Sequence, residues 1–198
     1  MQSESFIPLL YNNSMLKIVA VPNSILSSPT KPVDTIDNNI KKIVADMEKV
    51  LAAQNDPPGV GLAANQVRLD LSIFIIRLTE KSKTKVFINP TIISRSDPFK
   101  GSPKRARPYR RLSKKKVKLE GCLSIPRIWG PVKRSDRVFL KYQDLTGKEF
   151  VKWFSGFEAI IIQHEMDHLN GVVFTQRSVE QKGQLYREEN DELVKIEY

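Results

Sequence analysis

The chain has 198 residues, 40% of them hydrophobic and 27% charged, with 32 Lys and Arg against 22 Asp and Glu. This length suits one domain with a sizeable core, and the composition is typical of a soluble globular protein. The longest apolar runs, residues 71–76 and 159–162, fall far short of a membrane span, so we expect no membrane partner.

The surplus of positive charge belongs to one segment. Residues 100–118 contain ten Lys and Arg and no Asp or Glu, so the rest of the chain has 22 basic and 22 acidic residues. The basic character is therefore local and does not describe the whole surface. We expect one domain over residues 1–198, with a basic loop insertion at 96–118 and a peripheral acidic tail at 178–198, either a helix or frayed.

Apolar periodicity predicts the elements in chain order. Residues 16–21 suggest a short strand, and residues 36–54 predict an N-terminal amphipathic helix capped by Asp34 or Thr35. A series of apolar runs bounded by turn residues then predicts strands. They cover residues 71–78, 85–89, 91–95 beyond the break at Pro90, 116–119, 137–143 and 149–154.

A second helix is predicted from Phe157 to about Leu169. Residues 155–158 read as a capping box at its start, and residues 170–171, Asn-Gly, read as a left-handed stop. The order helix, several strands, helix indicates an α+β fold with mainly antiparallel β-sheets. We expect these sheets to pack around the second helix, which carries the residues discussed next.

The two histidines of the chain, His164 and His168, lie four residues apart on this helix. A helix brings positions i and i+4 onto one face, where two imidazoles can bind one metal ion. Glu165 lies between them, beside the position of a metal-bound water. Phe157 and Ile160 continue the same stripe, so the pattern predicts a metal-binding helix with a sheltered site.

Catalytic metal sites usually have a third protein ligand. The candidates are Cys122, which follows a glycine, and the downstream carboxylates Glu188 and Glu189. We favour Cys122 because the glutamates lie in a polar tail, although a buried structural cysteine is the ordinary alternative. Asp167 is either a hydrogen-bond partner that orients another group or an ordinary surface carboxylate.

Three segments together resemble the peptide deformylase family. They are residues 59–66, GVGLAANQ, residues 120–124, EGCLS, and residues 163–168, QHEMDH, in the order found in that family. The resemblance spans about residues 16–175. It implies a single catalytic domain that removes the N-formyl group from the N-terminal formylmethionine of newly made polypeptides and releases formate.

The resemblance also implies the role of individual residues. One divalent metal ion is held by Cys122, His164 and His168, and Glu165 acts as general base and then as general acid. Gln66 and the backbone N–H of Leu123 hydrogen-bond the substrate oxygen. The expected ion in the cell is Fe²⁺, with Zn²⁺, Ni²⁺ or Co²⁺ as substitutes in purified protein. These ions all accept thiolate and imidazole ligands.

An apolar pocket for the methionine side chain is expected beside the motifs. Its candidates are Val60, Phe157 and Ile160, whereas Ile161 is better explained by core packing. Gly61 can expose backbone groups that pair with an extended peptide. Arg68 occupies a position where the family pattern leads us to expect glycine, which concerns the local turn and not the chemistry.

The basic loop, Lys100 to Lys118, is longer and more charged than expected for the family. It is either a solvated insertion or a contact for ribosomal RNA, since Lys and Arg bind phosphates without regard to sequence. The lack of an evident export signal or transit peptide favours the cytoplasm of a bacterium, with an organelle matrix as the alternative.

Two other functions remain open at this stage. A general metallopeptidase would use Glu188 or Glu189 as the third ligand, and an RNA-binding module would carry a purely structural metal. Replacement of Cys122 separates the first from a deformylase, and replacement of Glu165 separates the second.

Overall fold

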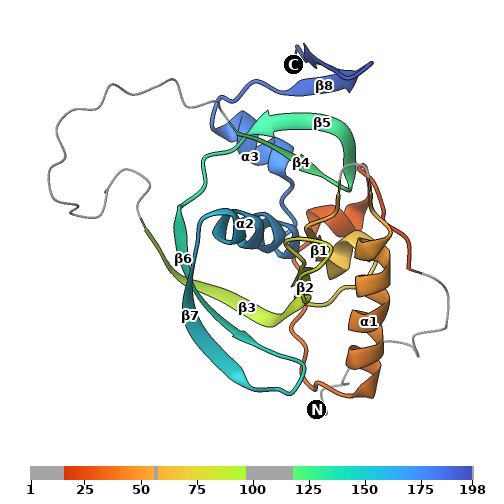
Figure 1. Ribbon diagram of the computed structural model, residues 1–198, viewed down its shortest axis with the longest axis vertical. Helices are drawn as coiled ribbons and strands as arrows, with labels where there is room; N and C mark the ends of the chain where they lie inside the picture. Colours follow the sequence, from red (N-terminus) through yellow and green to blue (C-terminus); the bar gives the residue numbers. More distant parts are fainter. Residues whose placement is uncertain (1–15, 56–57, 97–117, 198) are drawn as a thin grey trace, which may run out of the picture.

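The computed structural model describes residues 16–55, 58–96 and 118–197, which form two antiparallel sheets with helices between and beside them (Figure 1). One sheet has the strand order β1-β2-β3-β6-β7, and the other has the order β4-β5-β8-β9. The five strands of the larger sheet are β1 (Gly61–Ala63), β2 (Ile73–Ile76), β3 (Lys85–Arg95), β6 (Arg137–Gln143) and β7 (Glu149–Ser155). The expected α+β class with antiparallel sheets is therefore confirmed.

Strand β2 separates two halves of the core by simple alternation. Ile73 and Ile75 face the first helix, α1 (Asn38–Ala52), whereas Phe74 and Ile76 face the second helix, α2 (Phe157–Leu169). Successive side chains of a strand point to opposite faces, so a run of four buried apolar residues implies that both faces of the sheet are covered.

Helix α1 begins two residues later than the periodicity predicts. Its N-cap is Asp37, whose side chain accepts a hydrogen bond from the N–H of Ile40 at 2.9 Å, and not Asp34 or Thr35. The buried stripe is as expected. It consists of Ile40, Ile43, Val44, Met47 and Leu51.

The predicted break at Pro90 is wrong. Strand β3 runs through it, and the pairing with β6 shifts register between Ile88 and Thr91, so the proline lies at a bulge. Residues 16–21 are not a strand either. Val19 and Val21 instead donate backbone hydrogen bonds to the carbonyls of Gln66 and Ser124.

The motif at residues 59–66 contributes to β1 and to the short 3-10 helix η2 (Ala64–Val67). Arg68 is the C-cap of η2. Arg68 has φ 65° and ψ 25°, the left-handed conformation that glycine adopts at no steric cost. The expectation of a glycine at this position therefore has a backbone reason, and the turn forms with arginine in its place.

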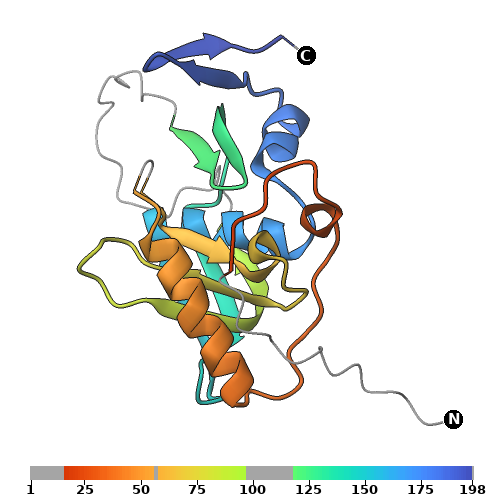
Figure 2. The same ribbon diagram turned by 90° about the vertical axis from the view of Figure 1, so that its right-hand side faces the viewer.

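The smaller sheet lies at one end of the molecule (Figure 2). It contains β4 (Leu119–Cys122), β5 (Ile125–Pro131), β8 (Tyr186–Glu189) and β9 (Glu192–Lys195), and α3 (Phe174–Glu180) packs beside it. The tail at 178–198 was expected to be helical or frayed. Its first residues end α3, but the later part forms the hairpin β8–β9 on β5. Of the predicted basic loop, residues 97–117 lie outside the described residues.

Helix α2 lies between the two sheets, with β1, β2 and β7 on one side and the small sheet on the other (Figure 1). It begins at Phe157 as predicted, but the capping box is wrong because Ser155 still belongs to β7 and Gly156 is the N-cap. Gly171, with φ 70°, follows the helix end as expected. None of the helices described reaches the length and apolarity needed to cross a membrane.

Candidate metal centre and active site

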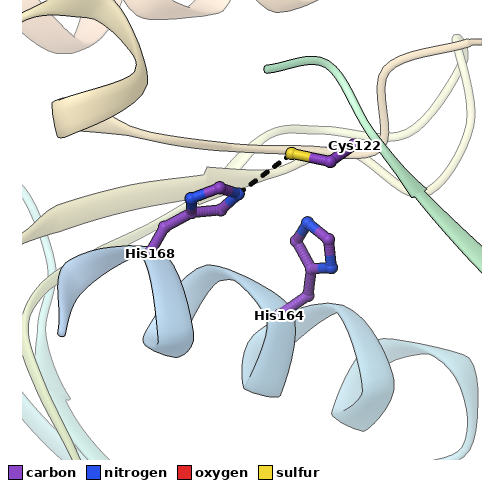
Figure 3. A group of neighbouring side chains, drawn as sticks. All are labelled: Cys122, His164 and His168. Atoms are coloured by element: carbon purple, nitrogen blue, oxygen red, sulfur yellow. Dashed lines mark hydrogen bonds between the residues drawn. The ribbon is translucent and has the colours of Figure 1, made fainter. Parts of the chain in front are cut away.

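Three side chains from two distant segments meet at the inner face of α2 (Figure 3). Cys122 ends β4, and His164 and His168 project from α2 one turn apart. Their potential ligand atoms all lie within 4.8 Å of one another, and the Cys122 Sγ lies 3.1 Å from the His168 Nε2. Within residues 16–55, 58–96 and 118–197 this is the one group of its kind.

Without a bound metal ion, the thiol and the imidazoles of this group shift each other's pKa strongly. Burial raises the pKa of the Cys122 thiol. The charge of His168 and hydrogen bonds from both imidazoles lower this pKa by more, so the net pKa lies well below the usual value. Burial lowers the pKa of His164, yet bonds to Cys122 and Glu120 raise it well above the usual value. A buried thiolate beside two imidazoles is a donor set that fits a borderline-soft divalent ion.

The orientation of His164 is fixed by a carboxylate that sequence reasoning missed. Its Nδ1 lies 3.1 Å from Glu120 Oε2. Glu120 in turn receives two hydrogen bonds from Arg134, both at 2.9 Å. Burial raises the pKa of Glu120, but the bonds from His164 and Arg134 outweigh it and lower the pKa. Such a partner sets the tautomer and ring orientation of a ligating histidine.

Asp167 is not a surface carboxylate. It is buried and accepts hydrogen bonds from Arg134 Nη1 and from Arg177 Nε and Nη2. Asp167 therefore orients Arg134 and does not contact His164. Its effect on His164 passes through Arg134 and Glu120. Glu120 stands in the second motif and could have been suspected, whereas Arg134 belongs to none of the three motifs.

Glu165 is buried and has one carboxylate oxygen, Oε2, without a hydrogen-bond partner among the described residues. Burial raises the pKa of Glu165, the neighbouring imidazolium charges lower it, and the net value is about 7. A carboxyl group with such a pKa exchanges protons readily near neutral pH. Gly61 lies against it, because a Cβ at Gly61 would overlap Glu165 Oε1.

Gln66 is held by both ends of its amide. Its Oε1 accepts from the N–H of Ala63 at 2.9 Å, and its Nε2 donates to Ser124 Oγ at 3.1 Å and points at Cys122 Sγ, 3.5 Å away. Leu123 lies in the turn between β4 and β5, with its side chain packed toward the α1 half of the core. The first and second motifs therefore meet at the cysteine.

The predicted substrate-binding residues lie at different distances from the histidines. Ile160 lies one turn before His164 on the same face of α2, and Val60 precedes β1 and packs against the core half that contains α2. Phe157 is 55% exposed at the start of α2, about 10 Å along the axis from His164. Gly61 lies against Glu165, and Phe157 lies at the start of the helix, away from the histidines.

The two glutamates considered as alternative third ligands have other partners. Glu188 accepts a hydrogen bond from Trp129 Nε1 at 2.7 Å, and Glu189 forms an exposed pair with Arg187 at 3.6 Å. Neither belongs to the group formed by Cys122 and the histidines. A metallopeptidase arrangement with a downstream glutamate is not supported.

A buried His-Glu-x-x-His helix facing a cysteine between two antiparallel sheets is the arrangement of a metal-dependent hydrolase. The family model for polypeptide deformylase matches residues 15–184. The peptide deformylase of Borreliella burgdorferi is 39% identical over 159 residues, 80% of this chain and 85% of its own length. Peptide deformylase 1 of Burkholderia multivorans is 39% identical over 164 residues, 82% of this chain and 80% of its own length.

Solved structures agree with this match. The crystal structure of a peptide deformylase from Legionella pneumophila has 32% identity and a TM-score of 0.68, covering 83% of this chain and 86% of its own. A plant peptide deformylase has 34% identity and a TM-score of 0.70, covering 86% and 84%. The chain belongs to the polypeptide deformylase family, whose members are metal-dependent hydrolases that remove the N-formyl group from nascent polypeptides.

Proposed function

We propose that Cys122, His164 and His168 hold one divalent metal ion, and that the site built on it deformylates the N-terminal formylmethionine of newly made polypeptides. The observation that carries this proposal is the meeting of the three ligand atoms within 4.8 Å, although the cysteine and the histidines lie more than 40 residues apart in the chain. Helix α2 is then the central metal-binding helix of the fold.

The metal we propose for the cell is Fe²⁺, with Zn²⁺, Ni²⁺ or Co²⁺ as substitutes, since all of them accept thiolate and imidazole ligands. A bound divalent ion supplies Lewis acidity and lowers the pKa of water. Glu120 keeps the His164 ring oriented, and Arg134 keeps Glu120 ionised inside the protein.

Glu165 is the proton carrier. Its carboxylate takes a proton from the attacking water and passes it to the departing amide nitrogen, first as general base and then as general acid. Two features support this role: the unpartnered Oε2 and a pKa of about 7, which lets the group both accept and release a proton near neutral pH. Gly61 leaves the space that this carboxylate occupies.

Gln66 and the backbone N–H of Leu123 stabilise the negative charge that develops on the formyl oxygen. The Gln66 amide is oriented by Ala63 and Ser124, and the N–H that points at Cys122 Sγ over 3.5 Å is the donor available to the formyl oxygen. One such preorganised donor typically contributes about 2.7–4 kcal/mol to lowering the barrier.

The substrate side of the site consists of Val60, Gly61, Phe157 and Ile160. Val60 and Ile160 offer apolar surface for the methionine side chain, and the edge strand β1 offers Gly61 for pairing with an extended peptide. Phe157, exposed at the rim, contacts the following residues of the substrate.

We further propose that residues 1–198 act as a single catalytic domain with an insertion at 96–118 and a peripheral tail at 178–198. The ten Lys and Arg of residues 100–118 contact ribosomal RNA near emerging chains, and the protein works in a bacterial cytoplasm, with an organelle matrix as the alternative. Deletion of residues 100–116 should then reduce co-sedimentation with ribosomes at low salt. Unchanged co-sedimentation contradicts the RNA contact.

The deciding experiment measures formate released from formyl-Met-Ala by the metal-loaded protein, with and without a strong chelator. Glu165→Gln should lose most turnover while retaining bound metal, and Glu158→Gln, a carboxylate on the same helix paired with the exposed Lys85, serves as the matched control. Chelator-insensitive turnover, or full activity in Glu165→Gln, contradicts the proposed metal-dependent mechanism. Absence of formate release from the metal-loaded protein favours the RNA-binding module with a structural metal.

A further inference from the structure

The hairpin β8–β9 lies beyond the residues that the family model matches, which end at 184. It is nevertheless joined to the strand that carries Cys122. Strand β8 pairs with β5, with Tyr186 opposite Trp129, and β5 pairs with β4. The connection from the hairpin to the cysteine therefore crosses a single intervening strand.

Trp129 is the residue of β5 that reaches across to β4. Its six-membered ring packs against Gly121, so closely that a Cβ at Gly121 would lie 2.8 Å from the ring. Gly121 stands between Glu120, which orients His164, and Cys122, and the pairing of β4 with β5 shifts register at this point. The ring occupies the space that a side chain at 121 would need and supports the local bulge.

Glu188 fixes the orientation of that ring. Its Oε2 accepts the hydrogen bond of the half-buried Trp129 indole at 2.7 Å, a charge-assisted bond. The indole N–H is a donor only, so this bond fixes which edge of the ring turns toward the hairpin and which edge lies over Gly121.

Apolar packing ties the same hairpin region to the metal ligands independently. Leu185, just before the hairpin, is buried in one cluster with Phe174, and Cys122 and Ile196, just after the hairpin, both pack against that cluster. The Phe174 ring in turn stacks on His164, with ring centroids 6.1 Å apart. The hairpin region thus shares a cluster with the cysteine and reaches His164 through Phe174 of α3.

We infer that the C-terminal hairpin is a positioning element of the active site: Glu188 orients Trp129, and Trp129 holds the bulge at Gly121 that places Cys122 and Glu120. Glu188 and Trp129 act through other residues and touch no reacting atom. The inference rests on the proposed role of Cys122 as a ligand. It gives Glu188, the rejected candidate ligand, a different function.

The test compares Glu188→Leu, which removes the acceptor, with Glu188→Gln, which keeps one, and with the matched control Glu189→Gln on the exposed neighbour. Metal affinity is measured with Co²⁺ in competition with a chelator, together with the Co²⁺–thiolate absorption band. We expect Glu188→Leu and Trp129→Phe to weaken Co²⁺ binding about tenfold, the lower range for loss of an orienting partner, and to shift the band. Turnover number should fall with KM unchanged, and both glutamine variants should behave as wild type.

A purely structural role predicts a different result. Glu188→Leu would then lower the melting temperature while the folded variant kept the Co²⁺ affinity and the absorption band of the wild type, and this outcome overturns the inference. If instead Cys122→Ser binds Co²⁺ as the wild type does, with no thiolate band lost, the proposed ligand set itself is wrong. The two failures are therefore distinguishable.

Discussion

The α-carbon of Gly61 lies directly against the carboxylate of Glu165. A Cβ built on Gly61 would overlap Glu165 Oε1 and come within 2.9 Å of Ile161 Cγ2. Since α2 is buried and packed on β1, the carboxylate has little room to retreat. The glycine of the first motif and the glutamate of the third are thus parts of one fitted contact.

Gly61→Ala should therefore displace Glu165. We expect kcat/KM for formyl-Met-Ala to fall by about 10²-fold, the effect of a displacement of roughly 1 Å in a catalytic group. The metal ligands are not in this contact, so bound metal should be retained, as atomic absorption would show. Gly61→Ala with wild-type kcat/KM would show that the carboxylate adapts at no cost to catalysis.

The pKa of Glu165 predicts a pH-dependent stability of the metal-free protein. Its pKa is raised from 4.5 to about 7, so between these values the unfolded chain ionises while the folded protein keeps its proton, and stability falls as pH rises. Glu165→Gln removes this term. Relative to the wild type, the variant should gain about 2–3 kcal/mol in free energy of unfolding between pH 5 and pH 8.

Urea denaturation of the metal-free wild type and Glu165→Gln at both pH values measures this difference. Glu158→Gln replaces a carboxylate that pairs with Lys85 at the surface and keeps Glu165. Its free energy of unfolding should therefore fall between the two pH values as that of the wild type does. Parallel stability profiles for wild type and Glu165→Gln would mean that Glu165 ionises normally in the folded protein.

Arg134 joins Glu120 and Asp167 and has only 7% of its side chain exposed. Arg134→Met leaves the buried Glu120 without its arginine and leaves Asp167 with Arg177 alone, and we expect a loss of about 3–5 kcal/mol in free energy of unfolding. Because Glu120 orients His164, metal affinity should also fall about 10- to 100-fold. Arg187→Met, at an exposed pair, should change stability by less than about 0.5 kcal/mol.

Arg68 holds a left-handed conformation that costs a residue with a Cβ roughly 1–2 kcal/mol. Part of the gain from Arg68→Gly is offset by the greater freedom of glycine in the unfolded chain, so we expect a net stabilisation of about 0.5–1 kcal/mol. Arg68→Ala keeps the Cβ and should not gain. Equal stabilities for the glycine and alanine variants, measured by urea denaturation, would rule out backbone strain at this turn.

Cys122→Ser tests the ligand set against the downstream glutamates. The thiolate lies 3.1 Å from His168 Nε2, whereas Glu188 bonds Trp129, so Cys122→Ser should abolish normal metal binding and Glu188→Gln should spare it. Metal content after dialysis is the measurement. The reverse pattern would restore the metallopeptidase alternative.

Local pattern was sufficient where neighbours in the chain decide the structure. The bounds of α2, the hairpin β6–β7 and the buried stripe of α1 follow from periodicity and turn residues that lie within one element. The spacing of His164 and His168 likewise places them on one face without knowledge of the rest of the fold. Strand interruption at Pro90 and a capping box at Ser155 were wrong because pairing across the sheet overrides local propensity there.

The amino-acid pattern alone was enough to predict the reactive set: an i, i+4 histidine pair with its glutamate, and a cysteine and a glutamine in motifs that imply the same site. The buried charges that support that set could be identified only from the folded chain. Arg134, Asp167 and Glu120 interact through contacts between segments far apart in the chain, and Glu188 turned out to bond a tryptophan. Long-range pairing of this kind leaves no periodic signal, because it depends on where the backbone of the whole fold places each side chain.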